Sequence, residues 1–174
     1  MHDWIVKSVA KNKTLLFSRP MDGMLSVQPE AIATIVRYSK PDGEHSEAGG
    51  VLLGRLILES RDVAIDRVTE PFEADKRSKF HFWRSRMPHQ NIVDQAWKNS
   101  TGTCIYLGEW HCHPEDDPHP SKHDLENWAK IARTASYEQD FLFFVIAGYT
   151  RIRAWELNKA RIKPTELLES ECGR

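Results

Sequence analysis

The sequence has 174 residues, of which 40% are hydrophobic, and its 24 lysine and arginine residues against 25 aspartate and glutamate residues give a formal net charge of -1. This length suits one domain with a single core, and the balanced charge excludes a protein that binds nucleic acid or anionic membrane through its overall charge. The three cysteines, Cys104, Cys112 and Cys172, exclude a disulfide framework and an all-cysteine zinc site, which indicates a reducing compartment.

Neither a targeting segment nor a membrane span is expected. Residues 1–13 contain no apolar core or cleavage-site pattern of a signal peptide. The longest apolar run, residues 141–148, is far too short to cross a bilayer. We therefore expect a soluble cytoplasmic protein.

The first part of the chain is expected to contain one helix among several strands. The helix should begin near Pro29, because proline suits the first helical position, and Ile32, Ile35 and Val36 then share one apolar face. The strands are expected as two short ones within residues 4–18 around a Lys-Asn-Lys turn, one at 50–58 that is buried on both faces, and one at 62–68 with alternating burial.

The second part of the chain begins with a polar, charged and aromatic excursion over residues 70–87, in which a short strand is expected at 80–83. The later elements are expected as helices at 89–99 and from about Ser121, strands at 103–111, 141–147 and 150–156, and a polar tail at 158–174 that is helical or disordered. This succession predicts a single α/β domain over residues 1–157, with its core at 30–157 and a central mixed β-sheet flanked by about three helices.

The residues that indicate chemistry lie between positions 111 and 124. Residues two apart on a strand point to the same side, so His111 and His113 can present two imidazoles to one point. Pro114 ends the strand, and a return of six residues leads to Ser121 and to Asp124 in the first turn of a helix. Two nitrogens and one carboxylate oxygen form a zinc site whose fourth position stays open to water, as in catalytic zinc sites.

Each half of this pattern also has a simpler interpretation. A His-x-His string alone is weak evidence for a metal. The pair Ser121 and Asp124 can be a helix cap, in which Ser121 accepts a backbone hydrogen bond and the helix dipole favours Asp124. The cap and the ligand interpretations can hold together, and the combined string is far more specific than either half.

A hydrolase also needs a general base and a donor to the oxyanion. Glu47 lies just before a buried strand, close to Gly49 and Gly50, and could take the proton of a water held at the metal. The alternative for Glu47 alone is a solvated acid in a turn. The Ser121 hydroxyl could donate to the oxyanion, and loss of such a donor typically costs about 10²–10³ in rate.

At these residues the chain resembles the JAMM metallopeptidases, the catalytic branch of the MPN-domain family. The family signature is a distant Glu, then His-x-His-Pro, six residues and Ser-x-x-Asp, and this chain matches it with Glu47, His111, His113, Pro114, Ser121 and Asp124. The resemblance implies an MPN/JAB-like domain in which both histidines and the aspartate bind one zinc ion. It further implies that Glu47 is the base and that Ser121 stabilises the intermediate. The departure is Cys112, where Ser or Thr is usual.

Residues 47–55, residues 106–111 and the helix that contains Trp128 resemble the prokaryotic JAB branch, and more narrowly the deconjugating peptidases of bacterial CBASS antiphage operons. This resemblance implies an isopeptidase that cleaves the bond between the C-terminus of a cGAS-like nucleotidyltransferase and its conjugation target. The expected partner is a protein substrate with an extended C-terminal tail, without membrane or nucleic acid. The alternatives are a JAMM peptidase for another ubiquitin-like or propeptide substrate, and a non-catalytic MPN scaffold, which the complete ligand set disfavours.

Residues close to the signature receive lesser roles. Strand alternation places Cys112 opposite the histidines, which disfavours it as a ligand or nucleophile. Glu109 shares their side of the strand and is a candidate to orient one of them. The remaining polar residues of this region are expected to be solvated: Glu115, Asp116, Asp117, His119 and His123.

The basic and aromatic residues 76–86 have the composition of a nucleic-acid patch, but in a neutral protein we expect a solvated surface. Our hypothesis is that part of this stretch lines a groove for an extended substrate tail, with Phe80 or Trp83 as the apolar contact. Peptides commonly add along the edge of a sheet in this way. A charge reversal at Arg84 or Arg86 tests the hypothesis.

Overall fold

The computed structural model of the protein describes residues 13–40, 46–161 and 163–170. The first of the two strands expected within residues 4–18 lies outside these ranges. The helices are α2 (Pro29–Tyr38), α3 (Arg86–Asn99) and α4 (Lys122–Thr134). The strands are β1 (Leu15–Ser18), β2 (Met24–Val27), β3 (Gly49–Leu56), β4 (Val63–Val68), β5 (Lys76–Arg77), β6 (Phe82–Trp83), β7 (Ile105–Cys112), β8 (Phe141–Ala147), β9 (Ile152–Asn158) and β10 (Thr165–Ser170).

The main sheet closes into a barrel with the strand order β1-β10-β9-β8-β7-β3-β4-β2. The predicted mixed sheet is confirmed, because β7 pairs with β8 in parallel and β2 with β4 in parallel, while the other neighbours are antiparallel. The prediction of a plain sheet flanked by helices is wrong, because β1 pairs with β10 on one side and with β2 on the other. The strand that completes the barrel, β10, comes from residues predicted as a helical or disordered tail.

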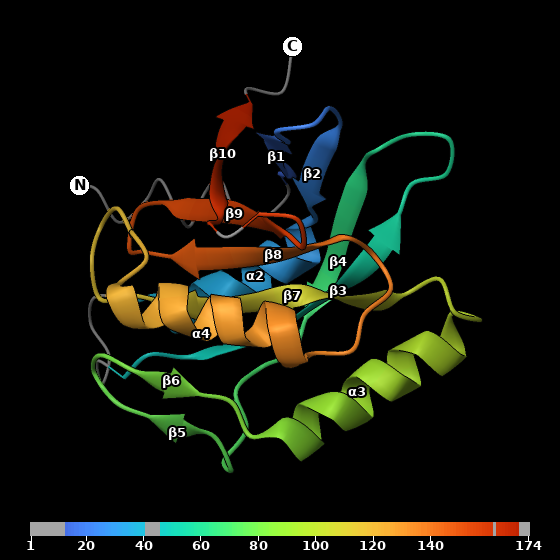
Figure 1. The fold of residues 1–174 in the computed structure, drawn as a ribbon. Coiled ribbons are helices and arrows are strands. Elements are labelled where there is room, and N and C mark those ends of the chain that lie inside the picture. Colours follow the sequence, from blue (N-terminus) through green and yellow to red (C-terminus); the bar gives the residue numbers. More distant parts are fainter. Residues whose placement is uncertain (1–12, 41–45, 162, 171–174) are drawn as a thin grey trace.

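Alternating residues of the strands build a core on each face of the sheet. On one face Phe143 packs in the same cluster as Ile35 of α2. On the other face Phe144 packs in the same cluster as Trp128 of α4, and Ala96 of α3 joins a third cluster. Helix α4 therefore crosses β7 and β8 on the face opposite α2, as Figure 1 shows with α4 in front of these strands and α2 behind them.

The helices and strands expected from residue 29 to residue 158 are all present, with α3 beginning at Arg86 rather than at residue 89 and β5 as an additional strand. The alternating burial expected for residues 62–68 is wrong at the start of the strand, where Val63, Ala64 and Ile65 are all buried. Val63 and Ile65 belong to the core cluster that contains Ile35 of α2, and Ala64 between them is buried as well. Among the described residues, no helix is both long and apolar enough to span a membrane.

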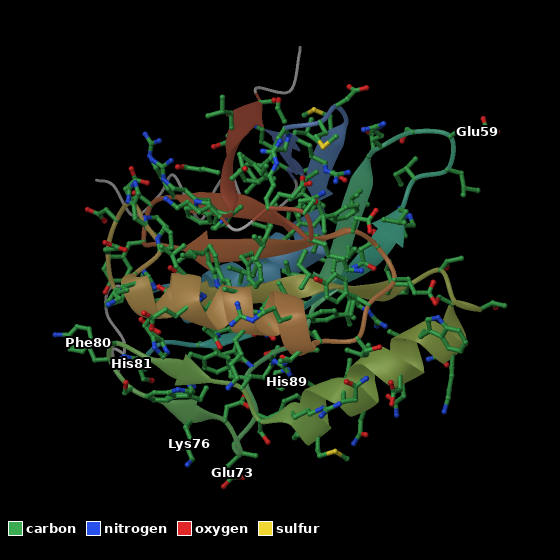
Figure 2. The ribbon with its side chains drawn as sticks, viewed as in Figure 1. Glu59, Glu73, Lys76, Phe80, His81 and His89 are labelled. Atoms are coloured by element: carbon green, nitrogen blue, oxygen red, sulfur yellow. The ribbon has the colours of Figure 1, made fainter. Side chains whose placement is uncertain are left out.

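The excursion between β4 and α3 is attached to the barrel through a buried histidine. His89 Nδ1 lies 2.6 Å from Thr69 Oγ1, and His89 Nε2 lies 3.1 Å from Asp75 Oδ2. Asp75 also accepts hydrogen bonds from the backbone N–H groups of Phe72 and Ser85. The hairpin β5–β6 therefore projects from a fixed base. Figure 2 shows Lys76, Phe80 and His81 at its outer edge and His89 further in.

Candidate metal centre

The two histidines of the signature converge at the end of β7. His111 lies on this strand and His113 directly follows it, while Cys112 between them points into the core formed with α2. The His111 Nε2 atom lies 2.9 Å from the His113 Nε2 atom. The prediction that both imidazoles face one point is therefore confirmed, and it follows from strand alternation.

The cap of α4 fixes the position of Asp124. Ser121 is the N-cap residue, and its Oγ accepts from the Asp124 backbone N–H at 3.2 Å. In return, Asp124 Oδ2 accepts from the Ser121 backbone N–H at 2.6 Å and from the Ser121 hydroxyl at 2.5 Å. The helix-cap interpretation is therefore confirmed. The cap holds one carboxylate oxygen and leaves Oδ1 directed at His111, 3.2 Å from its Nε2.

The spacing of these side chains fits a tetrahedral metal ion. One ligand atom from each of His111, His113 and Asp124 lies within 4.8 Å of the others, so the group could hold a metal. The two Nε2 atoms lie 2.9 Å apart, His111 Nε2 lies 3.2 Å from Asp124 Oδ1, and His113 Nε2 lies 3.4 Å from Asp124 Oδ2. Ligands at zinc–nitrogen and zinc–oxygen bond lengths lie about 3.3 Å apart at tetrahedral angles. The donor set and the geometry thus both suit zinc.

The charges at this site favour an anionic Asp124 and a proton on His113. Burial would raise the pKa of Asp124, but hydrogen bonds from His111 and His113 hold it well below its usual range. Burial would lower the pKa of His113, but hydrogen bonds to Asp124 and Glu115 outweigh that effect and raise the pKa to about 9. Binding of a cation at the His113 Nε2 atom therefore requires release of a proton.

Glu47 lies beside His113 and is buried, rather than lying in a solvated turn. Its Oε1 atom is 3.8 Å from His113 Nε2, and the residue is 6% exposed. Burial raises the pKa of Glu47 to about 7, although the nearby His113 charge lowers it in part. Its backbone is held by the hairpin, because the Glu47 N–H donates to Ser78 O at 2.7 Å and Arg77 Nε donates to Glu47 O at 2.8 Å.

The two glycines after Glu47 allow the strand to approach its neighbours closely. A Cβ at Gly49 would lie 2.5 Å from the Trp110 carbonyl oxygen and 2.7 Å from the Phe82 ring. A Cβ at Gly50 would lie 2.3 Å from the Thr69 carbonyl oxygen. Any side chain at these positions would push the start of β3 away from β7, and Glu47 with it.

Three neighbouring acids make contacts that were not predicted from the sequence. Glu109 does not orient a histidine, because its Oε1 accepts from Arg84 Nη2 at 2.7 Å. Glu115 is exposed, as expected for a solvated residue, and it also accepts from His113 Nδ1 at 2.9 Å. Asp117 is also paired, since both of its oxygens contact the Arg153 guanidinium at 2.5 and 2.7 Å. In the sequence, the contact between Glu115 and His113 was indicated only by the position of this carboxylate two residues after a candidate ligand.

The other residues considered near the signature are placed as follows. Cys112 is buried, its Sγ accepts from the Ala48 N–H at 3.2 Å, and burial raises its pKa to about 11, so the prediction that it points away from the metal is confirmed. His119 is exposed and contacts the Asp117 carbonyl oxygen. His123 is exposed as well and lies against the ring of His81 in the hairpin.

A groove of about 650 Å³ lies between α3 and α4 on the face of β7 that carries His111. Tyr106 and Val51 lie in its floor, and Arg86 and Lys130 lie on opposite sides. Arg84, at its edge, pairs with Glu109, which precedes His111 by two residues. In the hairpin, Phe80 and Trp83 are 66% and 48% exposed, so both are accessible to a ligand.

Comparison with known families gives one match over most of the chain. The family of prokaryotic homologs of the JAB domain matches residues 29–158. These residues extend from the start of α2 to the end of β9 and include Glu47, both histidines, Ser121 and Asp124.

Three similar bacterial proteins carry the name CD-NTase/cGAS isopeptidase. The protein of Escherichia coli (strain TW11681) is 32% identical over 114 residues, which are 66% of this chain and 72% of the relative. The protein of Vibrio cholerae is 31% identical over 67% of this chain and 73% of the relative. The protein of Pseudomonas aeruginosa is 34% identical over 63% of this chain and 68% of the relative.

The fold is also similar to a solved structure. The solution structure of protein DSY2949 from Desulfitobacterium hafniense matches 83% of this chain and 88% of its own, with a TM-score of 0.51. At 21% sequence identity this likeness concerns the fold alone.

Proposed function

Because this chain belongs to the family of prokaryotic homologs of the JAB domain, we propose that it is a zinc-dependent isopeptidase of the JAMM type. His111, His113 and Asp124 would hold the metal. The observation that carries the proposal is the tetrahedral spacing of these three side chains with the buried Glu47 carboxylate 3.8 Å from His113. The isopeptidase names of the similar bacterial proteins support the reaction class.

The metal and the residues around it have separate roles in hydrolysis. Zinc, when bound, supplies the Lewis acidity that lowers the pKa of a water and polarises a carbonyl. Glu47, with its pKa near 7, accepts the proton of the attacking water and returns it to the leaving amine. Ser121 donates a hydrogen bond from its hydroxyl to the oxyanion, for which the hydroxyl must turn away from Asp124 Oδ2.

The proposed substrate is a protein conjugated through an extended C-terminal tail. The similar proteins are named for a CD-NTase or cGAS, which supports a cGAS-like nucleotidyltransferase as the conjugated protein. The groove between α3 and α4 gives an extended chain room on the face that carries His111. In this proposal, Trp83 and Phe80 of the hairpin offer the apolar contact.

The test is a cleavage assay combined with a zinc measurement. A reporter is fused to the C-terminal tail of a bacterial cGAS-like nucleotidyltransferase, and cleavage is followed with and without a zinc chelator. The wild type should hold one zinc per chain and release the reporter at the last residue of the tail. The His113→Ala variant should lose both the zinc and the cleavage, because it lacks one of three ligands.

The outcomes separate the metal from the substrate. Cleavage that persists in the chelator and in His113→Ala would contradict the metal-dependent mechanism. A wild type that holds one zinc and does not cleave would leave the metal centre in place and contradict the proposed substrate.

A further inference from the structure

Glu115 contacts a side chain of the metal centre from the side that faces away from the metal. His113 Nε2 is directed at His111 and Asp124, whereas His113 Nδ1 lies 2.9 Å from Glu115 Oε1. A neutral imidazole carries one hydrogen, so a metal at Nε2 requires that hydrogen to be on Nδ1. The Nδ1–H of His113 then donates to the Glu115 carboxylate.

The position of Glu115 is fixed although its side chain is 47% exposed. Its Oε1 also accepts from the His119 backbone N–H at 3.2 Å, which orients the carboxylate. Its backbone carbonyl accepts from the Tyr149 N–H at 2.7 Å, which joins the loop to the turn between β8 and β9. The carboxylate is thus held in place for His113 from two directions.

We propose that Glu115 is a positioning residue that holds His113 in the orientation and tautomer in which Nε2 binds the metal. The inference rests on the proposed zinc centre. A carboxylate on the far nitrogen also makes the imidazole a better electron donor, and loss of such a partner typically costs about 10–100-fold in metal affinity.

Two neighbouring acids do not have this role. Glu109, on the same strand as His111, is paired with Arg84. Asp116, next to Glu115, is exposed, and among the described residues its carboxylate makes no hydrogen bond. Asp116 therefore provides a matched control for a change of charge in the same loop.

The experiment measures zinc affinity of the purified full chain by competition with a chromophoric chelator. Glu115→Ala should bind zinc about 10–100-fold more weakly than the wild type. Glu115→Gln keeps an oxygen that can accept from Nδ1–H but lacks the charge, so its loss should be smaller. Asp116→Asn should bind zinc as the wild type does. The visible spectrum of the cobalt-substituted protein should shift in Glu115→Ala and remain unchanged in Asp116→Asn.

Equal affinities of Glu115→Ala and the wild type would overturn the inference, and so would an equal loss in Asp116→Asn. Urea unfolding of the metal-free protein shows whether Glu115→Ala folds. If it does not, Glu115→Gln is used instead, and a zinc affinity and cobalt spectrum of Glu115→Gln that match those of the wild type would overturn the inference. Failure of the proposed function is distinct, because in that case the wild type itself binds no zinc.

Discussion

Glu47 combines two properties that general bases need. Burial raises its pKa to about 7, so near neutral pH the carboxylate can both accept and return a proton. Its contact with His113 at 3.8 Å places it beside the candidate ligands without making it one of the three converging groups. Its backbone bonds to the hairpin keep the side chain in this position.

At the residue scale, Glu47→Gln should retain zinc and lose about 10²–10⁴-fold in turnover number, because the amide has the same shape but cannot accept the proton. Zinc content and cleavage rate of the same preparation provide the measurement. Glu59→Gln, in the exposed turn between β3 and β4, is the matched control and should cleave normally (Figure 2). Normal turnover in Glu47→Gln would remove this residue from the mechanism.

The convergence of His111, His113 and Asp124 could be predicted from sequence because it follows local rules. Strand alternation joins His111 to His113, and the first turn of a helix places Asp124 three residues after its cap. Glu109 could not be assigned in this way, since its partner Arg84 comes from an excursion that is distant in sequence. The contact of Glu115 with His113 was not predicted, because the return of the loop toward His113 depends on the turn between β8 and β9.

At the scale of elements, the buried group Thr69, His89 and Asp75 determines where the hairpin lies. Thr69 belongs to the segment after β4 and accepts from the Val51 N–H through its hydroxyl, so His89 connects α3 to β3 as well. Loss of this connection would release the excursion that holds the Glu47 backbone. The sequence predicted the helix but not the contacts of His89 with Thr69 and Asp75. The residues next to a histidine on an apolar helix face do not indicate which distant residues it will contact.

Protonation of His89 should couple the stability of the fold to pH. Burial lowers the pKa of His89, with Arg84 adding to this effect and Asp75 and Glu109 opposing it. The folded state thus keeps His89 neutral at pH values where an unfolded histidine, with a pKa of about 6.5, takes up a proton. Its contribution to stability is complete above about pH 6.5 and is lost as the pH falls toward the lowered pKa of the folded state.

The measurement is the free energy of unfolding of the metal-free protein in urea at about pH 7.5 and about pH 5.5. The wild type should lose more stability between these values than His89→Gln. At the higher pH, His89→Gln should be less stable by about 1–3 kcal/mol, because a buried partner is left unpaired. His119→Gln, which changes an exposed histidine, is the control and should follow the wild type. Parallel pH profiles of the wild type and His89→Gln would contradict the assignment.

The groove between α3 and α4 makes the substrate-tail hypothesis testable through charge. Arg86 and Lys130 lie on its two sides and, among the described residues, form no ion pair, so an acidic tail should be favoured. Arg86→Glu should raise KM for such a tail by about two- to fivefold at an unchanged kcat, the effect of an exposed charge pair. Arg84→Glu should also lower stability, because it opposes Glu109.

Steady-state cleavage of a reporter with an acidic tail, compared with one whose tail is neutral, provides the measurement for both variants. Lys98→Glu, an exposed change at the other end of α3, is the control and should leave KM unchanged. Kinetics unaffected by either arginine reversal would end the hypothesis that this region receives the tail.

At the scale of the whole molecule, closure of the barrel depends on residues after the predicted end of the domain. Leu167 of β10 is 4% exposed and belongs to the same core as Phe17 of β1. Glu166 contacts Arg153 at 2.5 Å, and Arg153 holds Asp117 in the loop that leads to Asp124. The polar composition of residues 158–174 led to the prediction of a tail. A barrel strand with one buried leucine differs little in sequence from a solvated segment.

The predicted boundary after Leu157 can therefore be tested by removing residues 158–174. We expect this deletion to lower the free energy of unfolding by about 1.5–3 kcal/mol through loss of the buried Leu167 alone. The unpaired edges of β1 and β9 should also promote association of the chains. Zinc affinity should fall too, since Arg153 loses Glu166 and constrains Asp117 less firmly.

Urea unfolding, sedimentation and chelator competition, measured on the deletion and on a control that ends after Ser170, provide the comparison. The control keeps all of β10, so it should match the full chain in all three measurements. If the deletion is as stable and as monomeric as the control, residues 1–157 form an independent domain, as the sequence predicts. If only the deletion is destabilised and binds zinc more weakly, the last strand is part of the domain and supports the loop between the histidines and Asp124.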